Sequence, residues 1–204
     1  TAQINALEAN DVAEFAASQI ASLNATQVTA LTADIVAALA DTQIAALTSA
    51  QLQALTTDNV SALAQSQVEA LTTGQIAAFT TTQIAALDTA DMAEFNEDQI
   101  AALTVTQIRA ITAANLAALA DTQVQALTTA QLQAISTANI AQLTESQVAA
   151  LELTQVSAFT ASQISAFTDE NLSALDAAQV GALTTTQAKA ITAAQIDALT
   201  AADV

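Results

Sequence analysis

The sequence contains no His, Cys, Pro, Trp or Tyr, and only two Gly. Without His and Cys it offers no imidazole base, no thiolate nucleophile and no zinc or iron site of the usual kind. Its Ser and Thr hydroxyls therefore lack the activating partner that nucleophilic catalysis requires. Gly74 and Gly181 do not have the spacing of a phosphate-binding loop. We predict that the chain is not an enzyme and binds no cofactor.

Positive charge is nearly absent, because 2 basic residues stand against 20 acidic ones and the net charge is -18. Binding to nucleic acid or to anionic lipid needs clustered Lys and Arg, so neither partner is expected. The negative charge favours solubility and permits the binding of cations.

Long hydrophobic runs are also missing, although 53% of the residues are hydrophobic. Thr, Gln, Asp or Ser interrupts the apolar residues every few positions, and no run reaches the roughly 18 residues that a membrane span needs. We therefore predict no membrane insertion. The chain begins at Thr1 without a signal peptide, which we interpret as a segment of a longer protein.

What the sequence does contain is one motif repeated every eight residues from Gln3 to Asp203. In these octads, Thr48–Leu55 reads TSAQLQAL and Thr104–Ile111 reads TVTQIRAI. We number the positions of an octad from 1, which is Thr in both examples, to 8. Because no residue is inserted between octads, every octad is expected to have the same role in the fold.

Each position of the octad has its own chemistry. Position 8 is always Leu, Ile or Phe, and position 5 is Ile, Val or Leu except at Met92 and Ala188. Position 7 is nearly always Ala, and position 6 is mixed, as Glu69 and Arg109 illustrate. We therefore predict that positions 5 and 8 are buried, that position 7 is closely packed, and that position 6 faces water.

Position 1 predicts the start of a helix in every octad. Thr48 and Gln51 have the spacing of a capping box, in which the N-cap and N3 side chains each satisfy a backbone N–H of the other residue. Leu47 and Leu52 occupy the positions of the accompanying hydrophobic staple. A new helix every eight residues leaves room for helices of roughly five to seven residues.

A single long helix and a β-strand both fail to explain the pattern. In one continuous helix the apolar positions would drift by about 80° per octad, so no face would stay apolar. In a strand, positions 5 and 8 would point to opposite faces. Helices this short are unstable alone, so they must stack on one another. The sequence thus predicts an all-α solenoid with one short helix per octad.

Exceptions at position 4 indicate how the solenoid winds. They recur at intervals of 24 or 32 residues, at Asp11, Ile35, Asn59, Asp91, Asn115, Asn139, Asn171 and Asp203. A mark that recurs every three to four octads predicts a superhelix of about 3.3 octads per turn.

A longer repeat of 80 residues is visible as well. Residues 11–15 read DVAEF and residues 91–95 read DMAEF, and the two basic residues, Arg109 and Lys189, are also 80 apart. We predict one continuous octapeptide-repeat solenoid over 1–204 with a duplicated block at 11–90, 91–170 and, in part, 171–204.

An acidic cluster is the one candidate metal site. It consists of Asp88, Asp91, Glu94, Glu97 and Asp98, with a second, smaller group at Glu8, Asp11 and Glu14. Carboxylates three residues apart share a helix face and could bridge Ca²⁺. The cluster lacks the Gly turn of known calcium loops, so a solvated acidic surface is the simpler interpretation. Weak calcium binding stays an open alternative.

The remaining residue groups have structural interpretations. Tracts such as Thr80–Thr82 and Thr184–Thr186 could order hydroxyls for ice or carry sugar, but helix capping already explains the first Thr of each tract. Met92 and the five Phe lie at positions 5 and 8, where we expect core packing. The five Phe are Phe15, Phe79, Phe95, Phe159 and Phe167. A thin, solid solenoid is expected to have no pocket.

The octads, as in Thr80–Leu87 (TTTQIAAL), resemble the octapeptide tracts of large, acidic, secreted bacterial surface proteins, including adhesin-like and RTX-type chains. This resemblance implies an extracellular or cell-surface spacer or stalk and assigns no binding residue. The lack of Cys is compatible with an exported bacterial protein. The calcium-binding nonapeptides of RTX proteins are absent from this sequence.

Two functions therefore stay in competition. The first is a structural spacer in a larger surface protein, with self-association or lateral packing as its interaction. The second is a repetitive binding module that recognises peptide, glycan or ice through its outer face. A spacer predicts solution scattering that calcium does not change, whereas a calcium-dependent module should compact or gain helicity.

Overall fold

The computed structural model describes residues 8–198, apart from the side chains of Ala9 and Ala198. Gln3 and Asp203, at the two ends of the repeat, lie outside this range. Between residues 8 and 198 the secondary structure consists of short helices without strands, so the prediction of an all-α fold is confirmed. The chain divides into two compact units, 1–103 and 104–204. That the solenoid runs continuously over 1–204 stays a prediction.

Every described helix begins at position 2 of an octad and has four to six residues, as α9 and α6 illustrate. The helices of the first unit are α1 (Ala9–Ala13), α2 (Ala17–Ala21), α3 (Ala25–Thr29), α4 (Ala33–Ala38), α5 (Asp41–Ala45), α6 (Ser49–Ala54), α7 (Thr57–Ser61), α8 (Gln65–Glu69), α9 (Thr73–Ile76), α10 (Thr81–Ala86), α11 (Thr89–Ala93) and α12 (Glu97–Ala102). Those of the second unit are α13 (Val105–Ala110), α14 (Ala113–Ala118), α15 (Asp121–Ala126), α16 (Thr129–Ala134), α17 (Thr137–Ile140), α18 (Glu145–Ala149), α19 (Leu153–Ala158), α20 (Ala161–Ile164), α21 (Asp169–Ser173), α22 (Ala177–Ala182), α23 (Thr185–Ala188) and α24 (Ala193–Ala198).

The helices end because two consecutive residues are extended. Leu55, at position 8, has φ -61° and ψ 139°, and the following N-cap Thr56 has φ -70° and ψ 164°. Within residues 8–198 no residue has a positive φ, so the chain bends between helices without a glycine. A bend built from ordinary extended residues can be repeated in every octad.

The predicted capping box is present. Thr48 Oγ1 accepts a hydrogen bond from Gln51 N at 3.3 Å, and Gln51 Oε1 accepts one from Thr48 N at 2.8 Å. Where Ala stands at position 1, only the second bond remains, as from Ala40 N to Gln43 Oε1 at 2.7 Å. Each short helix is therefore closed at its N-terminus by its own octad.

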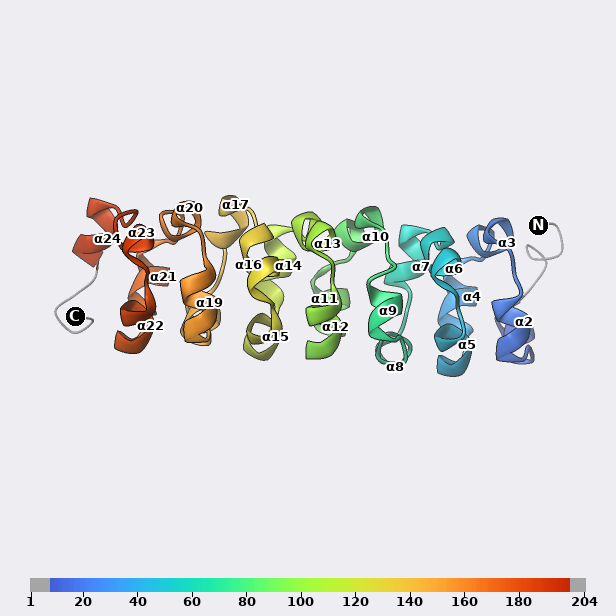
Figure 1. The fold of residues 1–204 in the computed structure, drawn as a ribbon. Coiled ribbons are helices and arrows are strands. Elements are labelled where there is room, and N and C mark those ends of the chain that lie inside the picture. Colours follow the sequence, from blue (N-terminus) through green and yellow to red (C-terminus); the bar gives the residue numbers. More distant parts are fainter. Residues whose placement is uncertain (1–7, 199–204) are drawn as a thin grey trace. The chain divides into compact units, whose positions relative to one another are not determined.

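Within each unit, a helix packs on the helix three places along the chain. In the first unit α3 packs on α6 and α9 on α12; in the second, α13 packs on α16 and α16 on α19 (Figure 1). Hydrogen bonds reach further, since Gln51 Nε2 donates to the carbonyl of Ile20, four octads earlier. The winding of each unit therefore lies between three and four octads per turn, as predicted. Both units are solenoids of short helices.

The two predicted apolar positions form the core of each unit. At position 5, Ile44, Ile84 and Val156 are 0% exposed, and at position 8 the Leu side chains of the central octads are buried. The rings of Phe159 and Phe167 meet edge to face with centroids 5.3 Å apart. Position 6 faces water at Gln53, as expected.

The burial of position 5 fails at Ala188, which is exposed, and at Ile196, which is 57% exposed. Ile196 belongs to the last described octad, and no later described octad packs on it. Phe15, in an early octad, is likewise only half-buried, whereas the other four Phe are buried.

Candidate functional site: the inter-repeat amide bonds

The polar feature that recurs most regularly in both units is the side-chain amide at position 4. Gln67 is 2% exposed, and its Oε1 accepts a hydrogen bond from the N-cap Ala64 N at 2.8 Å. Its Nε2 donates to the carbonyls of Val36 at 3.1 Å and Leu39 at 2.6 Å. One amide thus closes its own helix and joins it to an octad 28 to 31 residues earlier. We call the bonds from Nε2 or Nδ2 the inter-repeat amide bonds.

These bonds recur along both units with the same partners, the carbonyls of positions 5 and 8. In the first unit the Nε2 of Gln99 donates to Val68 at 2.7 Å and to Leu71 at 3.0 Å. In the second unit the Nε2 of Gln163 donates to Leu132 at 2.7 Å and to Ile135 at 2.9 Å. The same pair of bonds is made by Gln43, Gln51, Gln83, Gln147, Gln155, Gln179, Gln187 and Gln195.

The carbonyl at position 8 follows the end of its helix, where the last carbonyls have no partner within the helix. The carbonyl at position 5 already accepts from the N–H of position 8, as Val68 O does from Leu71 N at 3.0 Å, and the amide is its second donor. A buried carbonyl without a donor costs about 1–3 kcal/mol. Within residues 8–198, every fully buried side-chain nitrogen and oxygen has a hydrogen-bond partner.

Asparagine at position 4 donates to one carbonyl of the earlier octad, whereas Gln donates to two. Asn59 accepts from Thr56 N at 3.1 Å and donates through Nδ2 to the carbonyl of Leu31 at 3.1 Å. Asn171 likewise donates to Leu143 at 2.7 Å. The side chain is one methylene shorter than Gln, so the amides of Asn59 and Asn171 reach the position 8 carbonyl but not the position 5 carbonyl.

The inter-repeat role of position 4 was missed in the sequence, where Gln was interpreted only as the N3 partner of the cap. One signal was available. Glu serves a capping box as well as Gln does, yet no octad has Glu at position 4, although the chain contains 20 acidic residues. Gln or Asn stands at position 4 of most octads, with Asp11, Asp91, Asp203 and Ile35 as the exceptions, and this preference for amides over Glu favours a side chain that donates as well as accepts.

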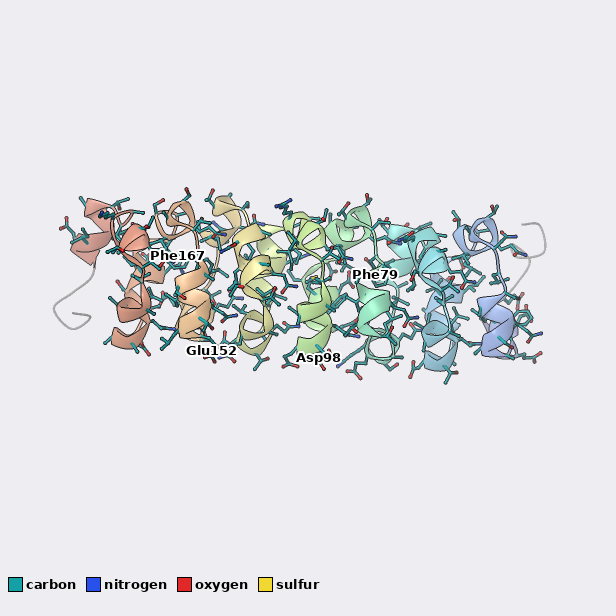
Figure 2. The ribbon with its side chains drawn as sticks, viewed as in Figure 1. Phe79, Asp98, Glu152 and Phe167 are labelled. Atoms are coloured by element: carbon teal, nitrogen blue, oxygen red, sulfur yellow. The ribbon has the colours of Figure 1, made fainter. Side chains whose placement is uncertain are left out.

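The candidate acidic cluster is spread along the surface of the first unit. Asp88, Glu97 and Asp98 are exposed, and Asp91 and Glu94 are half-buried. In Figure 2, Asp98 and Glu152 mark exposed carboxylates, whereas Phe79 and Phe167 are buried. Among residues 8–198, no group of three acidic side chains is placed to hold a metal ion. Weak calcium binding stays an untested prediction.

Two members of the cluster are the cap and N3 residues of α11. Asp88 Oδ1 accepts from Ala90 N at 2.8 Å and from Asp91 N at 2.9 Å, and Asp91 Oδ2 accepts from Asp88 N at 2.9 Å. Their position is thus explained by the helix start.

Burial raises the pKa of Glu94 above 4.5, and the negative charges of Asp91, Asp88 and Glu69 raise it further.

The Thr tracts contribute caps to their helices. Thr80 Oγ1 accepts from Gln83 N at 3.2 Å, and Thr184 Oγ1 accepts from Gln187 N at 3.3 Å. Thr81 and Thr82 are exposed. Met92 is 0% exposed and is a core residue, as predicted. Binding of ice or glycan by the Thr tracts stays an untested alternative.

The expectation that the solenoid has no pocket was wrong for the first unit. A cavity of about 250 Å³ is lined mainly by apolar residues, namely Val12, Phe15, Gln19, Ile20, Ser22, Leu23, Leu31 and Leu39. Its walls come from early octads, on which described octads pack from one side only. Among the residues that the structure describes, none with an ionisable side chain lines this cavity.

No helix within the described residues has the length and apolar character needed to cross a bilayer.

Comparison with known protein families identifies the repeat in two stretches. Residues 65–96 and 148–185 match the model of the ALTTAQ repeat. Ala70–Gln75 in the first stretch reads ALTTGQ, and Ala182–Gln187 in the second reads ALTTTQ. These six residues run from position 7 of one octad to position 4 of the next, so they contain the bend, the cap and the amide. The search of curated proteins returned no match. The chain is a repeat protein, and two stretches of it are similar to the ALTTAQ repeat.

Proposed function

We propose that this chain is a non-enzymatic structural spacer or stalk within a larger, secreted bacterial surface protein. The observation that carries the proposal is that the recurring polar side chains at positions 1 and 4 form hydrogen bonds within the repeat array. The hydroxyl at position 1 closes its own helix, and the amide at position 4 joins octads four apart. A repeat whose specific groups serve the repeat itself is suited to extending a chain by adding units.

The composition supports the same function. The only basic residues, Arg109 and Lys189, are both exposed, and the 20 acidic residues give the chain a net charge of -18. High net charge of one sign opposes aggregation and non-specific association. The extracellular location rests on the resemblance of the octads to tracts in secreted, acidic surface proteins.

The spacer proposal is tested by lengthening the array without changing its register. Variants would carry one or two extra copies of residues 91–170, inserted after residue 170. A spacer predicts that the maximum dimension from small-angle X-ray scattering rises by an equal increment per copy. The circular dichroism per residue should stay constant.

The response to calcium can contradict the spacer proposal. If millimolar calcium compacts the chain or increases its helicity, or if added copies do not extend it, the spacer proposal is wrong. Binding of defined glycans by the unmodified chain, or thermal hysteresis in its solutions, would instead favour the binding module. Labelling of intact cells that express the parent protein, with an antibody raised against this chain, tests the surface location.

A further inference from the structure

The sequence contains the motif Asn-X-Ser/Thr three times, and the structure places the three asparagines differently. In this motif the asparagine side chain is an acceptor for N-linked sugar. Asn24 begins Asn-Ala-Thr, Asn59 begins Asn-Val-Ser, and Asn171 begins Asn-Leu-Ser. Asn24 stands at position 1 of its octad, whereas the other two stand at position 4. The surroundings of each amide therefore decide which of the three can accept a sugar.

The amides of Asn59 and Asn171 are inaccessible. Asn59 is 1% exposed and Asn171 is 2% exposed. Their Nδ2 atoms donate to the carbonyls of Leu31 and Leu143, at 3.1 Å and 2.7 Å, as inter-repeat amide bonds. Because the interior of a protein is closely packed, a sugar has no room on either nitrogen while the octads stay together.

Asn24 uses its side chain in a way that leaves the nitrogen available. It is the exposed N-cap of α3, and its Oδ1 accepts a hydrogen bond from Gln27 N at 3.0 Å. Its backbone N–H donates to Gln27 Oε1 at 2.9 Å. Among residues 8–198, no partner accepts a hydrogen bond from Asn24 Nδ2. The cap therefore occupies the amide oxygen, and the amide nitrogen is left over.

The surface next to Asn24 has space for a sugar. Thr26, which supplies the hydroxyl of the motif, is exposed. Together with Ala25, Thr29 and Ala30 it lines an open hollow of about 490 Å³. All four side chains are small, so the hollow leaves room for a saccharide beside the motif.

We propose that Asn24 is the N-glycosylation site of this chain. Its Nδ2 attacks the anomeric carbon of a sugar that is activated through a diphosphate. The new N–C bond forms as the C–O bond to phosphate breaks, the diphosphate leaves with that electron pair, and a base of the glycosyltransferase takes one amide proton. The Oδ1 atom stays in place, so the cap of α3 survives the modification.

The test is the transfer of glucose to the purified, folded chain by a soluble N-glycosyltransferase, with UDP-glucose as the donor. Peptide mass spectrometry then locates the sugar. We expect one hexose per chain, attached to Asn24, and no transfer to Asn59 or Asn171. Synthetic peptides over residues 22–29, 57–64 and 169–176 present each motif without the fold, and all three should be accepted. Rejection of the last two peptides would mean that local sequence, and not burial, selects Asn24, and would overturn the structural argument.

Asn96 and the Thr26→Ala variant are the matched controls. Asn96 is an exposed N-cap that exchanges the same two hydrogen bonds with Gln99, but Asp98 follows it where the motif requires Ser or Thr. Thr26→Ala removes the hydroxyl of the motif and keeps both cap bonds of Asn24. We expect no sugar on Asn96 and none on Asn24 of the variant.

The proposal is overturned if the folded chain takes no sugar at Asn24, if either control is modified, or if Asn59 reacts as fast as Asn24. Asn24 without sugar in the parent protein, isolated from the cells that make it, overturns the proposal as well. The transfer assay uses the purified chain, so its result does not depend on the spacer function.

Discussion

The side-chain Nε2 of Gln99 lies 2.7 Å from the carbonyl oxygen of Val68, although 31 residues separate them in the sequence. The same nitrogen donates to Leu71, and the Oε1 of the side chain accepts from Asn96 N at 3.1 Å. Gln99 is 1% exposed. A single buried side chain thereby fixes the start of one helix and the end of another.

Replacing the donor nitrogen of Gln99 by oxygen should be costly. Gln99→Glu keeps the size of the side chain and the acceptor for Asn96 N but places a carboxylate against two carbonyls. We predict a loss of about 3 kcal/mol in the free energy of unfolding at pH 7, measured by urea denaturation. Gln99→Asn should lose about 1 kcal/mol, because the shorter amide retains the bond to Leu71.

Gln53→Glu is the control for the charge that Gln99→Glu introduces. Gln53 is exposed at position 6 of its octad, so its replacement should change stability by no more than about 0.5 kcal/mol. If Gln99→Glu and Gln53→Glu cost the same, the amide of Gln99 has no role in joining octads.

The caps offer a pair of opposite substitutions. Thr48→Ala removes the Oγ1 that accepts from Gln51 N, and should destabilise the chain by about 1 kcal/mol. Ala40→Thr adds the missing acceptor to an exposed N-cap whose backbone angles, φ -68° and ψ 153°, are close to those of Thr48. It should therefore stabilise the chain by a similar amount, measured in the same denaturation experiment. If Thr48→Ala does not destabilise the chain and Ala40→Thr does not stabilise it, the N-cap side chain does not contribute to the stability of these helices.

We predict that Glu94→Gln raises the melting temperature in a pH-dependent way. Its pKa in the folded chain lies above 4.5, so folding disfavours the ionised form, and this cost is present above the raised pKa and absent below about 4.5. Glu94→Gln removes the cost. The variant should melt at a higher temperature than the unmodified chain at pH 7, and this difference should vanish as the pH falls below about 4.5.

Glu170 is the matched Glu with a shift of the opposite sign. The hydrogen bond from its own backbone N–H, together with one from Thr168, lowers its pKa below 4.5. Its contribution to stability is therefore present above 4.5 and lost as the pH falls through the lowered pKa. Glu170→Gln should lower the melting temperature slightly at pH 7. A gain from Glu170→Gln equal to that from Glu94→Gln would mean that only net charge matters.

Local patterns in the sequence predicted much of the fold. Thr48 and Gln51 predicted the helix start, and the three-residue spacing of Leu52 and Leu55 predicted the buried face, because both signals act within one octad. The partner of the Gln51 amide could not be predicted in this way, since Ile20 and Leu23 become its neighbours only through the winding of the solenoid. The cavity near Phe15 was missed for the same reason, as it depends on which octads pack on which.

The central claim is that buried amides at position 4 join octads that are four apart. A long-range NMR experiment on the ¹³C,¹⁵N-labelled chain, which detects scalar coupling across hydrogen bonds, tests it directly. The Nε2 of Gln99 should couple to the carbonyl carbons of Val68 and Leu71, and that of Gln163 to those of Leu132 and Ile135. Absence of these couplings, together with side-chain amide protons of Gln99 that exchange with water as fast as those of exposed Gln53, would contradict the account.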